Sequence, residues 1–183
     1  MSQSAVLDRP GLTSTARMWG LTWLLATAAV TFLAAGDDSA LPHSLEVWDN
    51  AARTSLPVWL MAWLGLLVVT FLGSLAFVRH HVAARWVLGG FVLSHAIVAI
   101  IEGGGLATLR NGLVSVTHVV GWTLSAVVLI GALPGTDPRT PYGFWCRALL
   151  AIIAIAFVFD VRDAALYLYY QGVGHPALAT LVG

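Results

Sequence analysis

The segment WCRALLAIIAIAFVFDVRDAALYLYY, residues 145–170, decides the fold class of this chain. It is an almost unbroken apolar run, and about 17–25 such residues are enough to cross the hydrocarbon core of a bilayer as a helix. Arg147 stands near its start, and three more charged side chains, those of Asp160, Arg162 and Asp163, lie deep within the run. The segment therefore predicts a membrane-spanning helix that carries charge inside the membrane.

The composition of the whole chain also indicates a membrane environment. Of its 183 residues, 58% are hydrophobic and only 10% are charged, whereas an average soluble domain has about 25% charged residues. Nine basic and nine acidic residues balance each other, so the chain has no basic surface for nucleic acid. The single Cys146 excludes an intramolecular disulfide and a metal site built from several cysteines.

Four further apolar stretches of sufficient length precede this segment. Turn-forming residues separate them, including Gly103–Gly105 after the third stretch and Pro134–Gly135 after the fourth. No convincing cleavage site follows the first stretch, so we interpret it as a retained helix and not as a signal peptide. The sequence predicts an all-α polytopic transmembrane helical bundle, one domain over residues 1–183, with about five spans at residues 18–35, 57–78, 83–101, 112–133 and 145–170.

The distribution of arginine predicts the orientation. Six of the nine arginines lie in, or within a few residues of, the N-terminal tail, the connection between the second and third spans, and the connection between the fourth and fifth. With five spans these three segments share one side, which the positive-inside rule assigns to the cytoplasm. The C-terminus then faces the exterior or periplasm, and we expect an integral protein of the bacterial inner (plasma) membrane.

The third and fourth spans carry polar side chains at helical spacing. His95 and Glu102 are seven residues apart in the third span, so they lie on one helix face. The fourth span has a polar stripe formed by Asn111, Ser115, His118, Trp122 and Ser125. Ionisable groups at membrane depth are costly, and they are therefore functional candidates that need a partner.

The charged residues of the fifth span complete the candidate site. Asp160 and Asp163 share a helix face with Tyr167 and Tyr170, whereas Arg162 is expected to point away from that face. At 1.5 Å per residue, His95, His118 and Asp160 all lie about 10–15 Å below the exterior ends of their spans. We expect the core of one site to consist of His95, His118, Asp160 and Asp163, with supporting roles for Glu102, Arg110, Ser115, Arg162 and Tyr167.

Three interpretations of these residues remain open. The leading one is a carrier, channel or transport subunit that handles a proton or small cation through a His and carboxylate site. The second is a membrane redox subunit or metalloenzyme, in which the two His and two Asp bind a divalent metal, or the paired His hold haem b with Gly89, Gly90 and Gly121 giving the ring room. In the third, the histidines only link helices and an aspartate pairs with Arg162 or Arg110, as in a non-catalytic assembly subunit.

The remaining expectations concern activity and partners. The sequence has no nucleophile elbow, phosphate-binding loop or serine triad pattern, so it favours a protein that is not an enzyme. The lipid bilayer is the predicted partner, and a second copy of the chain or another membrane subunit stays open as a further one.

Overall fold

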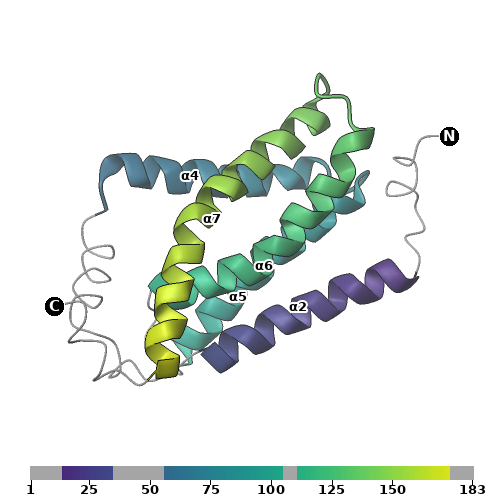
Figure 1. The fold of residues 1–183 in the computed structure, drawn as a ribbon. Helices are drawn as coiled ribbons and strands as arrows, with labels where there is room; N and C mark the ends of the chain where they lie inside the picture. Colours follow the sequence, from purple (N-terminus) through teal and green to yellow (C-terminus); the bar gives the residue numbers. More distant parts are fainter. Residues whose placement is uncertain (1–13, 35–55, 105–110, 174–183) are drawn as a thin grey trace.

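The computed structural model of the chain describes residues 14–34, 56–104 and 111–173 (Figure 1). All regular secondary structure in these ranges is helical. The helices are α2 (Ser14–Ala34), α4 (Val58–Leu72), α5 (Val82–Gly103), α6 (Asn111–Ala132) and α7 (Pro141–Val173). Two short 3-10 helices, η2 (Gly73–Ala76) and η3 (Leu133–Gly135), follow α4 and α6.

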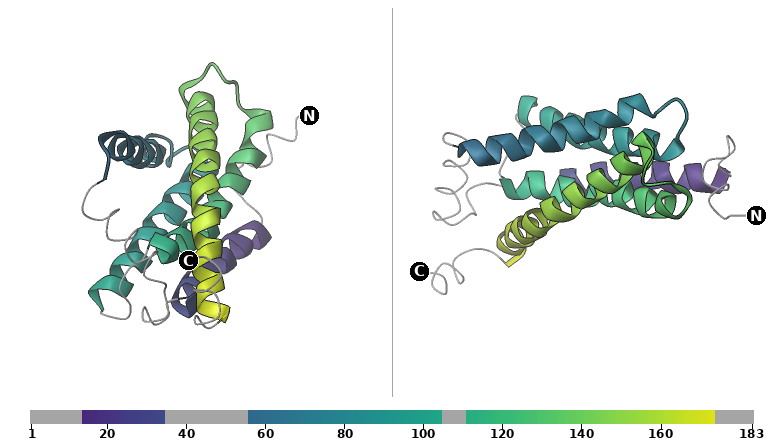
Figure 2. Two further views of the ribbon diagram at one scale, coloured as in Figure 1. Left: turned by 60° about the vertical axis from the view of Figure 1, so that its left-hand side comes forward. Right: turned by 90° about the horizontal axis from the view of Figure 1, so that it is seen from above.

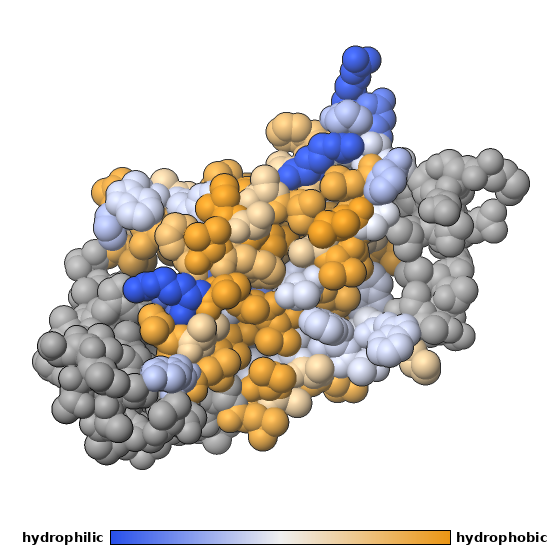
Figure 3. Space-filling view, viewed as in Figure 1, coloured by the Kyte–Doolittle hydropathy of each residue, from blue (hydrophilic) through white to orange (hydrophobic). Residues whose placement is uncertain are grey.

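Four helical segments in the described part of the chain are long and apolar enough to cross a membrane: Val58–Ala76, Val82–Ile101, Gly112–Gly135 and Pro141–Tyr169. Helix α2 adds a shorter apolar stretch, Met18–Leu33. Hydrophobic residues cover most of the described surface on the face shown in Figure 3, and strongly hydrophilic ones appear near the upper end, where α6 connects to α7, and in a smaller group on the left. The prediction of an all-α helical membrane bundle is confirmed.

The helices are not equally enclosed by their neighbours. Helices α2, α5 and α7 all pack on α6, which lies in the middle of the bundle (Figures 1 and 2). In the span formed by α4 and η2 only 17% of the residues are buried, against 44% in the α6 span. Helix α4 therefore lies at the edge, where Figure 2 shows it standing off from the other helices.

Helix α7 begins earlier than the sequence predicted. The expected span started at residue 145, whereas the helix starts at Pro141. Thr140 precedes it, and its Oγ1 accepts a hydrogen bond from the backbone N–H of Gly143 at 3.1 Å, as a helix N-cap does. Proline is favoured as the first helical residue because its missing N–H would have no partner there. The pair Thr140–Pro141 is thus a start signal that the hydrophobic pattern alone did not indicate.

Small residues allow α5 and α6 to approach closely. A Cβ atom added to Gly90 would lie 3.2 Å from the backbone oxygen of Gly121, and one added to Gly121 would lie 3.3 Å from the methyl group of Thr27 on α2. Gly112, near the start of α6, is similarly close to Tyr167 of α7, whose Cβ and ring would overlap an added Cβ. Such small-residue contacts are typical of helix packing in membranes.

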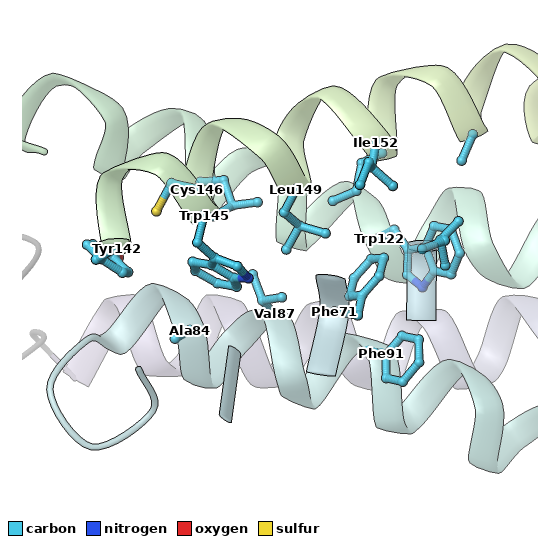
Figure 4. Close-up of a cluster of buried hydrophobic side chains, with 14 residues drawn as sticks. Phe71, Ala84, Val87, Phe91, Trp122, Tyr142, Trp145, Cys146, Leu149 and Ile152 are labelled. Carbon is cyan, nitrogen blue, oxygen red and sulfur yellow. The ribbon is translucent and has the colours of Figure 1, made fainter. Parts of the chain in front are cut away.

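Two separate hydrophobic clusters make up the core. The larger cluster (Figure 4) is built around Phe71, Phe91, Trp122 and Trp145, and Phe71 stacks on Phe91 with ring centroids 4.8 Å apart. The smaller cluster consists of Ile97, Ile101, Leu113, Val116, Ala164 and Tyr167. Helices α5, α6 and α7 contribute to both clusters, so each of them passes from one to the other along its length.

A polar layer separates the two clusters. Along α5 the change of cluster falls between Phe91 and Ile97, along α6 between Val116 and Trp122, and along α7 between Ala156 and Ala164. These three intervals contain His95, His118 and Asp160 respectively. We use the term polar layer for His95, His118 and Asp160 together with Ser94 and Ser115.

Candidate functional site

Asp160 of α7 meets two side chains of α6. The Oγ of Ser115 donates a hydrogen bond to Oδ1 of Asp160 at 3.2 Å, and Nδ1 of His118 lies 3.4 Å from Oδ2. Ser115 and His118 are three residues apart, so they project from the same face of α6. The side chains of His118 and Asp160 are only 18% and 17% exposed. Both oxygens of this carboxylate are therefore directed at polar groups inside the bundle.

An aromatic contact fixes the ring of His118. The indole of Trp122, one turn along α6, stacks on the imidazole with centroids 4.0 Å apart and an interplanar angle of 13°. The Nε1–H of Trp122 donates to the Oγ of Ser94 on α5 at 3.3 Å, so the indole is itself held between two helices. The stack and the Asp160 contact together hold His118 in one orientation.

His95 is the member of the layer contributed by α5. Its Nδ1 lies 2.8 Å from the carbonyl oxygen of Phe91 and 3.3 Å from the Oγ of Ser94. Since a carbonyl oxygen can only accept, this contact assigns the proton to Nδ1 and leaves a lone pair on Nε2 in the neutral ring. The ring centroids of His95 and His118 are 5.9 Å apart. Unlike His118, His95 is exposed on the side of the bundle.

Asp163 lies outside this network, one turn farther along α7. Its Oδ1 accepts a hydrogen bond from Nη1 of Arg162 at 3.0 Å, and its side chain is 15% exposed against 70% for Arg162. The guanidinium was expected to leave the shared face of the aspartates. It folds back instead, because the long arginine side chain can reach the neighbouring carboxylate while its own backbone position faces outward.

The supporting residues other than Arg162 divide into three groups. Ser115 belongs to the network, as described above. Tyr167 is buried in the smaller cluster, where it packs against Gly112 of α6. The Glu102 side chain and Arg110 lie outside the described residues.

The geometry restricts what the site can hold. Among the described residues, no three His, Cys, Asp or Glu side chains are grouped as they would be around a metal ion. The contact between Gly90 and Gly121 closes the space between α5 and α6 that the haem interpretation required. The residues can exchange protons, since a carboxylate, a hydroxyl and two imidazoles follow one another across three helices.

Sequence reasoning missed Ser94 and the way Trp122 is used. Trp122 had been placed on the polar stripe, but its role as a platform for His118 depends on the indole turning parallel to the imidazole. Ser94 is buried and links the two histidine-bearing helices. Its position next to His95 was the available signal, because a buried serine in a close-packed helix pair commonly accepts an interhelical hydrogen bond.

Comparison with known protein families, with curated protein sequences and with solved structures finds no match for this chain.

Proposed function

We propose that this integral membrane protein moves protons through the polar layer, as a carrier, channel or transport subunit. The observation that supports the proposal is the approach of His118 Nδ1 to Asp160 Oδ2 at 3.4 Å, between apolar clusters inside two candidate spans. Polar and ionisable groups at membrane depth are retained mainly where a proton or ion pathway needs them.

The chemistry of the layer favours a proton over an alkali or alkaline-earth cation. Such cations require several oxygen ligands, about 6–8 for Ca²⁺. The layer offers the carboxylate of Asp160 and the hydroxyl oxygens of Ser94 and Ser115, and both carboxylate oxygens already have partners. An imidazole, by contrast, can accept a proton on one ring nitrogen and release one from the other.

The geometry also supports a path for the proton along the polar layer, from Asp160 through His118 to His95. Asp160 and His118 exchange a proton through Nδ1, and the remaining Nε2 of His118 passes it toward His95, whose ring centroid is 5.9 Å away. A bridging water can carry a proton across such a separation. His95 is then the last described member of this path, on the α5 side of the bundle.

A matched pair of aspartate variants tests this function. In vesicles that contain the purified full chain, an imposed potential should drive proton uptake, reported by an internal pH dye. Asp160→Asn keeps size and polarity but removes the proton-accepting carboxylate, so uptake should fall by about 100-fold or more. Asp163→Asn makes the same chemical change one turn away and should retain uptake, because Asp163 contacts exposed Arg162 and not the histidines.

Two results would contradict the proposal. Equal loss in both variants would mean that charge in this part of α7 matters for folding and not for proton movement. Absence of uptake by the unchanged protein would leave the assembly-subunit interpretation.

The orientation of the chain is proposed on separate grounds. The rings of His81 and Tyr142 stack with centroids 3.5 Å apart, so the connections before α5 and before α7 meet at one end of the bundle. Arg79 and Arg139 lie in these connections and Arg85 lies in the first turn of α5, and the positive-inside rule favours the cytoplasm for this end. Reporter fusions after residue 183 and within residues 134–140 should report opposite sides of the membrane. The same side for both would remove one of the five spans.

A further inference from the structure

Both histidines of the polar layer have one ring nitrogen anchored. Nδ1 of His95 faces the backbone carbonyl of Phe91, and Nδ1 of His118 faces the carboxylate of Asp160. Within the described residues no hydrogen-bond partner is found for Nε2 of either ring. Metal-binding histidines commonly show this arrangement, in which a carbonyl or carboxylate orients the ring and the other nitrogen binds the ion.

The spacing of the two rings matches a shared ion. Since Zn–N bonds are about 2.0–2.1 Å long, two imidazoles on one ion have centroids about 5–6.5 Å apart, according to the N–Zn–N angle. The observed separation of His95 and His118 is 5.9 Å, with 33° between the ring planes. An ion between the two Nε2 atoms is therefore compatible with the spacing already present.

The packing around the two imidazole rings favours a single metal ion over a haem between them. Gly90 and Gly121 bring α5 and α6 into contact about one turn away from the histidines, and the Trp122 to Ser94 hydrogen bond joins the same helices beside them. A flat macrocycle between the rings would have to separate these contacts. A single ion between the two rings needs no such movement.

We propose that Nε2 of His95 and Nε2 of His118 bind one transition-metal ion with an affinity for imidazole, such as Zn²⁺, with water completing its coordination. Two protein ligands leave open positions, which suits an exchangeable ion more than a structural one. The consequence for activity rests on the proposed function: the ion occupies the lone pairs that a moving proton needs, so it should inhibit proton uptake.

Binding is tested on the full chain in detergent, purified with a tag that contains no histidine and stripped of metal with a chelator. Zn²⁺ titrated by calorimetry should bind one ion per chain, and Co²⁺ should give visible absorption bands that report nitrogen ligation. His95→Ala and His118→Ala should each weaken binding at least 10-fold. His80→Ala is the matched control, because His80 is exposed in the connection before α5 and should change nothing.

A positioning effect separates this site from adventitious binding to surface histidines. Asp160→Asn leaves both ligand nitrogens in place but alters the group that orients His118, so it should weaken Zn²⁺ binding about 10–100-fold. Equal affinity in the unchanged protein and the His95→Ala, His118→Ala double variant would overturn the proposal. A Soret band in the purified protein would overturn it as well, in favour of haem.

The proton function and the metal site can be disproved independently of each other. Proton uptake that is present in chelator and insensitive to Zn²⁺, together with no specific binding, would remove the metal site and keep the proton function. Specific Zn²⁺ binding without proton uptake under any condition would remove the proton function and keep the metal site.

Discussion

Two neighbouring residues of α6, Thr117 and His118, face different helices and use their polar atoms differently. The hydroxyl of Thr117 is fully buried against α2, 3.0 Å from the Leu113 carbonyl of its own helix and 3.2 Å from the hydroxyl of Thr31. His118 faces α7 and Asp160, and its second ring nitrogen has no partner in the described part of the chain. We call the Thr117 side, with Thr27 and Thr31, the threonine seam.

The difference distinguishes polar residues that only pack helices together from polar residues that can bind a proton or an ion. In the threonine seam each hydroxyl satisfies a carbonyl one turn back on its own helix: Thr27 to Trp23, Thr31 to Thr27 and Thr117 to Leu113. Such hydroxyls have used their single proton within their own helix, so they cannot donate it elsewhere and mainly allow close approach of the helices. The polar layer keeps unused lone pairs on two imidazoles, and that spare capacity is what a proton or an ion can use.

The largest expected effect comes from the two histidines. His95→Ala and His118→Ala should each lower proton uptake about 100-fold, because each removes one step of a single path. The double variant should be no worse than either single one, since a serial path is lost only once. Thr117→Ala is the seam control and should retain uptake per folded molecule. Mild, additive losses of proton uptake in the two histidine variants would mean that the polar layer, like the threonine seam, only packs helices together.

A second, smaller effect, on stability, is expected where Thr27 of the threonine seam contacts Gly121. Gly121→Leu places a side chain where the methyl of Thr27 would lie 3.3 Å from Cβ, so α2 has to move, at a cost of about 1–3 kcal/mol. The free energy of unfolding in mixed micelles, measured by denaturant titration, reports it.

Gly89→Leu is the matched control for this change. A Cβ at Gly89 meets nothing within 4 Å, so the same substitution on α5 should leave stability unchanged or raise it through better helix propensity. A larger loss at Gly89 than at Gly121 would mean that the seam does not set the packing of these helices.

Hydrophobic patterning was sufficient to predict the helices but not their contacts. Apolar length gave spans at 57–78, 83–101 and 112–133 that agree with α4 plus η2, α5 and α6 within a few residues. The length of a membrane-spanning helix can be predicted directly from sequence, because the thickness of the bilayer sets how many apolar residues are needed. The start of α7 was missed because it depends on a cap, in which one threonine oxygen meets one backbone N–H.

The candidate site was predictable in part for a similar reason. Depth along a helix follows from counting residues, and it placed His95, His118 and Asp160 at one level, where the polar layer lies. Counting does not give the rotation of one helix about its axis relative to the next, or the reach of a long side chain. Asp163 was therefore grouped with the histidines, although its contact is with Arg162.

The smallest effect is expected at Arg162, and it concerns the charges that interrupt the last apolar helix. Its side chain is 70% exposed and pairs with Asp163 at 3.0 Å, and exposed ion pairs contribute about 0–1 kcal/mol. Arg162→Gln should therefore change the free energy of unfolding by less than about 1 kcal/mol and leave proton uptake unchanged. The remaining Asp163 carboxylate can be protonated, which removes its charge. A loss of several kcal/mol would instead mean that Arg162 is covered by a partner subunit in the membrane, since only a desolvated pair costs that much to break. Comparing Arg162→Gln with Asp160→Asn then shows which of the charges at residues 160–163 serves the polar layer and which only offsets a neighbour.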